Sequence, residues 1–310
     1  MTNFLALDGG TTNTRIVLMR DGTPDISVKL AVGAGSYREK SEYFEAISKG
    51  ISELLERSGL TEADIECVVA SGMVTSEKGL YELPHISVPA GINELAHGMK
   101  EVSFPEITSI PFWFIPGVKQ VSENLCDTDM MRGEETELTG LCDNILPNCM
   151  YVLPGSHSKL ILTDDNGRIT SFKTMLTGEM LASLSAHTIL RDAVSFTDVS
   201  IDECYLNTGC EYAESHGLNE ALFKVRILKN LLGADKNEVY SFFLGAVLQG
   251  EIAQIVASGA EKVVVGGKAA LRSSMLALLQ SRTESELIDA GERSDIASAI
   301  GAARILEFSN

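Results

Sequence analysis

Two segments of the chain share one pattern, and this pattern constrains the fold more than any other feature. Near the start, an apolar run at 3–8 ends in an acid and a Gly-Gly turn, and a second run follows at 14–20. About 145 residues later, runs at 149–153 and 159–162 flank a Pro-Gly-Ser-His-Ser turn, and a third run covers 169–175. Each segment predicts β-strands joined by a glycine-containing turn. The recurrence predicts two parts of the chain with the same architecture.

Apolar periodicity predicts the other elements of an α/β chain with mixed sheets flanked by helices. The first segment continues as a strand at 25–32, a helix at 37–57 and a buried strand at 65–70. A strand at 262–265 runs directly into the third glycine turn, Gly266 and Gly267. Helices are predicted at 179–190, 202–216, 219–232, 237–257, 268–281 and 295–307.

Composition narrows the class of partner. The net charge of −18 argues against a nucleic acid or an anionic membrane, because both require a basic surface. The six cysteines form no C-x-x-C pair and none has a histidine at zinc-site spacing, which favours a reducing cytoplasm. We expect no signal peptide and no membrane span, because Asp8 interrupts the first apolar run and no run reaches about 18 residues.

The three glycine turns predict contacts with a nucleotide. Glycines allow the backbone to approach a ligand closely, and successive N–H groups in a turn suit a phosphate. Asp8 ends the first strand, where a carboxylate can bind Mg²⁺. Asp-Gly is also a common signal for a hairpin turn, so the first turn alone leaves the phosphate role open. Gly33-Ala34-Gly35 is interpreted as a plain loop.

In this order, the three turns resemble the ATP-binding core of the actin, hexokinase and Hsp70 superfamily. The resemblance implies a two-lobed actin-like (ribonuclease H-like) fold with ATP in the cleft between the lobes. We expect one lobe to comprise 1–142 with 295–310 and the other to comprise 143–294. The implied phosphate and adenosine contacts are Gly9, Gly10, Thr11, Thr12, Asn13, Arg15, Gly155, Ser156, Gly266 and Gly267.

Several longer segments resemble the 2-dehydro-3-deoxygalactonokinase family. They are 8–15, 70–74, 115–117, 131–140, 152–159 and 175–179, the fourth reading Met-Arg-Gly-Glu-Glu-Thr-Glu-Leu-Thr-Gly. The resemblance implies a cytoplasmic kinase of galactonate catabolism. Its expected reaction converts ATP and 2-dehydro-3-deoxy-D-galactonate to ADP and the 6-phosphate, with ATP and Mg²⁺ as cofactors. No P-loop or protein-kinase signature is present.

The family resemblance also directs attention to the residues that would act on the acceptor. Glu134 or Glu135, in the first turn of an expected helix, is the candidate catalytic base, with Asp129 as an outside candidate. First-turn acids also complement the helix dipole without any catalytic role. Asp8 is the candidate metal ligand.

Four further residues are candidates for the sugar-acid site: Arg132, His157, Lys159 and Glu179. Strand alternation places His157 and Lys159 on one face. For each of them an ordinary structural role is the competing interpretation.

Two alternatives stay open at this point. One is a kinase of another sugar or sugar acid on the same fold. The other, from a different class, is a regulatory ATPase switch that acts by conformational change. The expected partner is a small sugar acid, with no nucleic acid and no membrane, and homodimer formation is left open.

Overall fold

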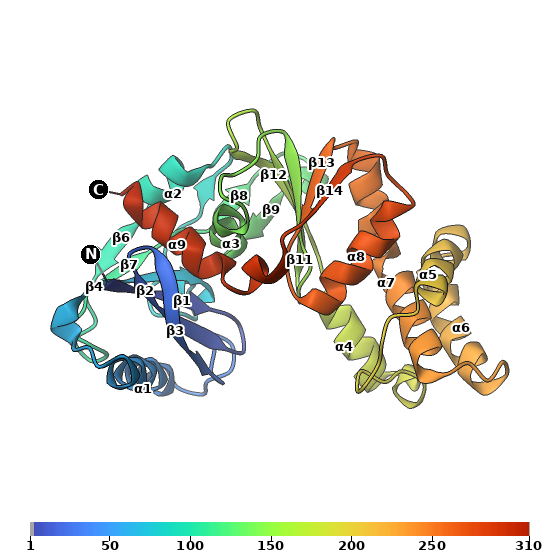
Figure 1. Cartoon of the computed structure of the whole chain (residues 1–310), viewed down its shortest axis with the longest axis horizontal. Helices are drawn as coiled ribbons and strands as arrows, with labels where there is room; N and C mark the ends of the chain where they lie inside the picture. Colours follow the sequence, from blue (N-terminus) through green and yellow to red (C-terminus); the bar gives the residue numbers. More distant parts are fainter. Residues whose placement is uncertain (1–2, 310) are drawn as a thin grey trace. The chain divides into compact units, whose positions relative to one another are not determined.

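The structure is a computed structural model that describes residues 3–309. The chain forms two compact units (Figure 1). Unit 1 comprises residues 1–147, 163–172 and 292–310, and unit 2 comprises 148–162 and 173–291. These limits differ from the lobes expected from the sequence, because 143–147, 163–172 and 292–294 belong to unit 1.

Unit 1 is built on a six-stranded mixed sheet in the order β3-β2-β1-β4-β7-β6. Strands β1 and β2 are antiparallel, as are β2 and β3, whereas β4 runs parallel to β1 and β7 runs parallel to β4. The strands are β1 (Asn3–Gly9), β2 (Thr14–Arg20), β3 (Thr23–Leu30), β4 (Ile65–Gly72), β6 (Lys100–Val102) and β7 (Phe112–Phe114).

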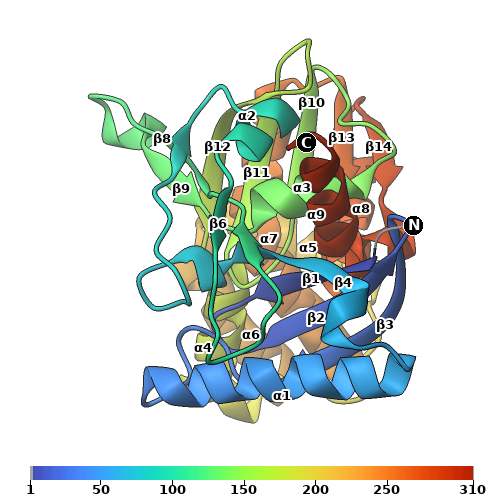
Figure 2. The same cartoon turned by 90° about the vertical axis from the view of Figure 1, so that its left-hand side faces the viewer.

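Helices cover both faces of this sheet, as Figure 2 shows. On one face lies α1 (Lys40–Ser58), whose Ile47, Ile51 and Leu54 join the core that Leu5 and Leu7 line. On the other face lie α3 (Glu134–Leu141) and α9 (Ala297–Glu307). Alternate residues of β1 point to opposite faces, so Asp8 faces the α9 side.

Smaller elements complete unit 1. A three-stranded sheet in the order β5-β8-β9 joins Ile86–Ser87, Val118–Gln120 and Asp129–Met131. The short helix α2 covers Ile92–His97. The strands of this small sheet have two or three residues each, which is too short for a periodic signal, and the sequence reasoning did not predict the sheet.

A second sheet has the order β12-β11-β10-β13-β14 and repeats the topology of β3-β2-β1-β4-β7; most of it belongs to unit 2, while residues 163–172 belong to unit 1. As in unit 1, a central strand pairs antiparallel with the next strand in sequence and parallel with a later one. The strands are β10 (Cys149–Leu153), β11 (Ser158–Thr163), β12 (Ile169–Met175), β13 (Lys262–Val265) and β14 (Glu286–Asp289). The expected recurrence of a strand–glycine turn–strand pattern is therefore confirmed.

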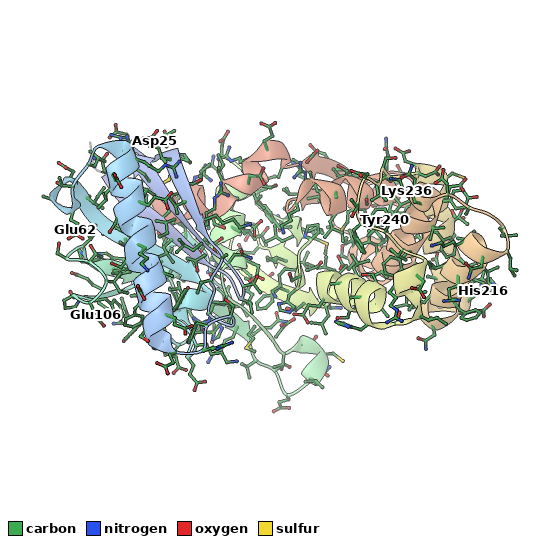
Figure 3. The ribbon with its side chains drawn as sticks, turned by 90° about the horizontal axis from the view of Figure 1, so that it is seen from below. Asp25, Glu62, Glu106, His216, Lys236 and Tyr240 are labelled. Carbon is green, nitrogen blue, oxygen red and sulfur yellow. The ribbon has the colours of Figure 1, made fainter. Side chains whose placement is uncertain are left out.

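Helices form most of the rest of unit 2. They are α4 (Thr177–His187), α5 (Glu203–His216), α6 (Leu218–Asn230), α7 (Lys236–Ser258) and α8 (Ala269–Gln280). Lys236 and Tyr240, labelled in Figure 3, mark the first turns of α7. Within the described residues, α7 is the one helix whose length and apolarity suit a membrane span, and 72% of that stretch is buried in the protein. Core helices commonly share this composition.

Glycines allow two helix pairs to cross in close contact. A Cβ on Gly301 of α9 would overlap the Thr136 carbonyl oxygen of α3, and a Cβ on Gly140 would overlap the Ala297 carbonyl oxygen. In unit 2, a Cβ on Gly245 of α7 would overlap the Leu206 carbonyl oxygen of α5. The α3–α9 contact fixes the helix that carries the candidate base.

We expect Gly301→Ala to lower the free energy of unfolding by about 1–3 kcal/mol, because the new methyl group overpacks a backbone contact. Gly250→Ala is the matched control, since Gly250 is also helical but has open space around its Cβ position. This control is expected to stabilise by up to about 1 kcal/mol through helix propensity. Urea unfolding checks both values, and equal effects of the two substitutions would contradict the close-contact account.

Candidate active site

The first glycine turn joins β1 to β2, and the backbone of a second loop is hydrogen-bonded to it. Gly10 N–H donates to the Asn13 carbonyl at 2.8 Å, which closes the turn. The side chains of Thr11, Thr12 and Asn13 are exposed on it. These features match a turn that presents polar groups to a ligand.

The supporting segment, Gly33-Ala34-Gly35, is a loop, as interpreted from the sequence, and its backbone is hydrogen-bonded to the first glycine turn. Ala34 N–H donates to the Gly10 carbonyl at 3.0 Å, and Gly35 N–H donates to the Thr11 carbonyl at 2.8 Å. A Cβ on Gly33 would overlap the Gly10 carbonyl oxygen. Gly33 and Gly35, separated by a single residue, are the sequence signal that could have indicated this close backbone approach.

Asp8 lies at the carboxyl end of β1, beside a cavity of about 30 Å³. Arg15, Asp295 and Ser298 also line that cavity, and Arg15 donates to the Asp295 carbonyl. The pKa of Asp8 is raised to about 6: burial is the main cause and the charge of Glu134 adds to it, while a hydrogen bond from Ser298 and the charge of Arg15 oppose the rise. A carboxylate that is costly to ionise in the free protein would gain from binding a cation.

Close contacts at Gly72 and Gly133 place the start of α3, which carries the candidate bases Glu134 and Glu135, near Asp8. Gly72, which ends β4 with φ +79°, would meet the Asp8 carboxylate at 3.1 Å if it had a Cβ. Gly133, with φ +110°, would meet the Gly72 Cα at 3.1 Å. Because β1 and β4 are parallel, their carboxyl ends lie at one edge of the sheet, and α3 begins there. The expected helix at Glu134 and Glu135 is confirmed.

Glu134 and Glu135 differ in exposure and in partners. Glu135 is fully buried, and its carboxylate accepts the Gly133 N–H at 2.8 and 2.9 Å. Burial raises its pKa to about 7, with Glu134 adding to the rise. Glu134 is half-buried, and its carboxylate accepts the Arg132 N–H at 3.0 Å. Of the two, Glu134 has the side chain that a ligand can reach.

Glu137 is a fourth carboxylate in this cluster, and the sequence reasoning missed it. Burial, together with the charges of Asp8, Glu134 and Glu135, raises its pKa to about 8. Its position three residues after Glu134 on a helix is a signal that could have identified it. No three acidic, histidine or cysteine side chains within 3–309 are arranged to ligate a metal ion.

The Arg132 guanidinium is engaged within unit 1. It donates to the Thr75 carbonyl at 2.5 Å, to the Leu83 carbonyl at 3.0 Å and to His85 Nδ1 at 3.2 Å. Burial lowers the pKa of His85 to about 4, helped by the Arg132 charge, so this histidine is neutral. The contacts fix the chain just before α3.

Asp129, the outside candidate for the base, begins β9 and accepts the Met130 N–H at 2.7 Å.

The second glycine turn joins β10 to β11 in unit 2 and contacts the start of α4. Gly178 N–H donates to the Gly155 carbonyl at 3.0 Å, and Glu179 N–H donates to the Ser156 carbonyl at 3.3 Å. His157 Nε2 lies 2.8 Å from Glu179 Oε1. The structure thus brings together two of the four residues expected to bind the sugar acid, as an exposed pair.

Lys159 does not share a face with His157, so that expectation is wrong. β11 begins at Ser158, which leaves His157 in the turn, and Lys159 is only 4% exposed. Glu251 of α7 is also buried below this turn, where burial raises its pKa to about 7 against an opposing hydrogen bond from Ser158. The alternation rule does not apply to His157, because β11 begins at Ser158, one residue before the expected strand, and His157 remains in the turn.

The third glycine turn lies beside the second. Since β10 and β13 are parallel, their carboxyl ends meet at one edge of the unit 2 sheet. Gly266 N–H donates to the Val152 carbonyl at 2.9 Å. Gly267, with φ +76°, would meet the Pro154 carbonyl oxygen at 2.5 Å if it had a Cβ. This crowding and the positive φ require glycine at 267.

We expect Glu137→Gln to stabilise the folded protein increasingly as pH rises, because burial and the neighbouring carboxylates disfavour the charged form of Glu137. The pKa of Glu137 is raised on folding, so its contribution to stability is fully present below about pH 4.5 and is lost as pH rises to about 8. The slope approaches about 1.4 kcal/mol per pH unit for a group that titrates fully. Urea unfolding from pH 5 to 8 measures the wild-type-to-variant difference. Glu45→Gln, at an exposed site, is the control, and a Glu137→Gln difference independent of pH would contradict the account.

Solved structures establish the fold class. A Sinorhizobium meliloti protein, solved as a candidate 2-dehydro-3-deoxygalactonokinase, superposes with a TM-score of 0.79 at 24% identity, covering 97% of this chain and 96% of that one. The activator of 2-hydroxyisocaproyl-CoA dehydratase from Clostridium difficile, solved with bound ADPNP, gives a TM-score of 0.54 at 16% identity over 98% of this chain and 93% of that one. The protein shares the α/β fold of these two structures, and this fold class agrees with the one expected from the sequence.

The family follows from the sequence match. The model of the 2-keto-3-deoxy-galactonokinase family matches residues 8–299, and the chain belongs to this family. The 2-dehydro-3-deoxygalactonokinase of Escherichia coli (strain K12) is 30% identical over 195 residues. That alignment spans 61% of this chain and 61% of the E. coli protein.

Proposed function

We propose that the protein is an ATP-dependent kinase that converts 2-dehydro-3-deoxy-D-galactonate to its 6-phosphate. The observation that carries this proposal is the cluster of Asp8, Glu134 and Glu135 beside the first glycine turn, in a chain of this family. Phosphoryl transfer to an alcohol requires charge neutralisation, positioning and an acceptor for the hydroxyl proton. The cluster offers a residue for the first task and one for the last.

ATP contacts are assigned to glycine turns in each unit. In unit 1, Gly9, Gly10, Thr11, Thr12 and Asn13 bind phosphate oxygens through the turn backbone and hydroxyls, with Arg15 nearby. In unit 2, Gly155 and Ser156 act in the same way. Gly266 and Gly267 leave a surface without side chains at the end of β13, which suits the adenosine. The C. difficile activator, which has the same fold, was solved with bound ADPNP.

Asp8 is assigned to Mg²⁺. Magnesium retains several waters and takes one or two carboxylates together with substrate phosphates, so a single protein carboxylate fits it. When bound, the ion neutralises charge on the transferred phosphoryl group. The raised pKa of Asp8 means that binding the cation also stabilises its charged form.

Glu134 is assigned as the base that accepts the proton of the acceptor hydroxyl. It is half-buried at the start of α3, and the Arg132 N–H fixes its carboxylate. Glu135 is buried against Gly133, so we give it a positioning role. A dissociative transition state leaves proton transfer until late, so the reaction demands little of the base before that point.

The direct sugar-acid contacts are assigned to His157 and Glu179, with Lys159 and Arg132 in supporting roles. The His157–Glu179 pair is exposed and offers both a donor and an acceptor to a hydroxylated substrate. Lys159 is only 4% exposed, so we give it a supporting role as a positive charge next to the second turn. Arg132 acts through position, since its guanidinium contacts Thr75 and His85. A cytoplasmic location follows from the substrate and from the free cysteines.

The proposal is tested by a coupled assay of ADP release with a panel of acceptors. We expect rapid ADP release with 2-dehydro-3-deoxy-D-galactonate and slower release with aldonic acids that lack the 2-keto group or with neutral hexoses. A preference for another sugar would overturn the choice of substrate. ADP release that is independent of any added acceptor would favour an ATPase switch.

A further inference from the structure

A second cavity lies in unit 1, apart from the residues assigned to catalysis. Its volume is about 480 Å³, within the range of about 300–1,000 Å³ typical of small-molecule sites. Its wall comes from the start of α2, the segment after α3, the β11–β12 connection and the last turn of α9. None of the residues assigned to ATP, metal or acceptor binding lines it.

Two arginines place fixed guanidinium groups on the wall of this cavity, among the carboxylates of Glu94, Asp143 and Glu307. Arg168 is held by Asp164, with its Nε 2.9 Å and its Nη2 2.8 Å from the carboxylate. Arg304 donates to the Thr139 carbonyl at 2.6 Å and also to the Cys142 carbonyl. Their side chains remain 40% and 22% exposed, and a guanidinium carries five N–H donors. Arginines fixed in this way suit a carboxylate, because little side-chain entropy is lost on binding.

The rest of the wall suits a hydroxylated carbon chain. The exposed amides of Asn93 and Asn144 can donate to and accept from hydroxyl groups. The carboxylates of Glu94 and Glu307 add acceptors. Phe308, whose side chain is 51% exposed, offers an apolar ring for C–H groups.

The same charges argue against other ligands. Glu94, Glu307 and the 89% exposed Asp143 would repel a polyphosphate. Arg168 and Arg304 would repel a divalent cation. A ligand with a single negative charge and several hydroxyl groups matches the cavity best. We propose that this cavity binds a polyhydroxylated carboxylic acid of sugar-acid size, at a site separate from the active site and independent of the proposed reaction.

Isothermal titration of the full chain with D-galactonate tests this proposal. We expect one binding event to be lost or weakened at least about tenfold in Arg168→Gln, which removes charge-assisted hydrogen bonds. Asn144→Phe is expected to do the same by filling the cavity. Asn230→Phe, an equally exposed change on α6, is the matched control and should leave binding unchanged. Thermal unfolding of each variant verifies that it is folded.

Glu134→Gln separates this site from the active site, and the binding event is expected to persist in it. The proposal is overturned if no binding occurs at millimolar D-galactonate, if Asn144→Phe and Arg168→Gln bind like the wild type, or if Glu134→Gln abolishes the event. Kinase activity of Asn144→Phe is measured in parallel. A chain that binds D-galactonate in this cavity but phosphorylates no sugar acid would contradict only the proposed function.

Discussion

Glu134→Gln is expected to lower kcat by about two to four decades, the usual cost of losing a general base. The substitution keeps the shape of the side chain and an oxygen that can accept the Arg132 N–H, so α3 should begin at the same residue. Affinity for a non-hydrolysable ATP analogue is expected to be unchanged, because the assigned ATP contacts lie elsewhere. Steady-state kinetics and calorimetric titration of the analogue measure the two quantities.

Two controls separate catalysis from helix capping. Glu42 is also in the first turn of a helix and accepts a backbone N–H, from Arg38 at 3.1 Å, so Glu42→Gln should keep the wild-type rate. Glu135→Gln is expected to lower kcat by about 10- to 100-fold, less than Glu134→Gln, because its buried carboxylate acts by positioning other groups. A larger loss in Glu135→Gln than in Glu134→Gln would reverse the two assignments. Near-wild-type rates in both would remove the base from this helix.

Asp8→Asn is expected to abolish most activity while making the free protein more stable. Loss of a metal ligand should lower kcat at least about 100-fold, and the rate should depend more steeply on the Mg²⁺ concentration. Because burial raises the pKa of Asp8 to about 6, its charged form opposes folding above that pH. At pH 8 the neutral asparagine therefore removes an unfavourable charge, and the urea midpoint should rise.

Asp8→Asn is expected to lower activity but to raise stability, and this combination makes the test specific. A variant that lost activity by misfolding would lose stability as well. Asp25→Asn is the control, since Asp25 pairs with Arg20 on the surface of unit 1 and should affect neither quantity. Full activity of Asp8→Asn at low Mg²⁺ would contradict the metal assignment.

The fold could be predicted where apolar periodicity was long and uninterrupted. This holds for β1, β2, β4, α1 and the recurrence in unit 2. β14 was missed because its four residues, Glu286–Asp289, are exposed or half-buried and carry no apolar run. The small sheet of β5, β8 and β9 was missed for lack of length. The pairing of strands far apart in sequence depends on packing that local pattern does not encode.

The candidate site could be predicted as a set of segments but not as a geometry. The sequence indicated that Asp8 and the Glu134–Glu135 pair belong to one site, and the structure places both at one edge of the unit 1 sheet. It did not indicate that Glu135 is buried, that Glu137 joins the cluster or that Lys159 is buried. Those facts depend on which face of a helix or strand meets its neighbours. Here, glycine contacts such as Gly72 against Gly133 decide the position of α3.

The most direct test of the central claim is to identify the product formed from 2-dehydro-3-deoxy-D-galactonate and ATP. Phosphorus and carbon NMR of the purified product locate the phosphoryl group, while ADP is quantified in the same reaction. The account predicts one phosphate on O6 for each ADP released, and loss of both signals in Glu134→Gln. ADP release without a phosphorylated sugar acid, or phosphorylation with wild-type rates in Glu134→Gln, would contradict it.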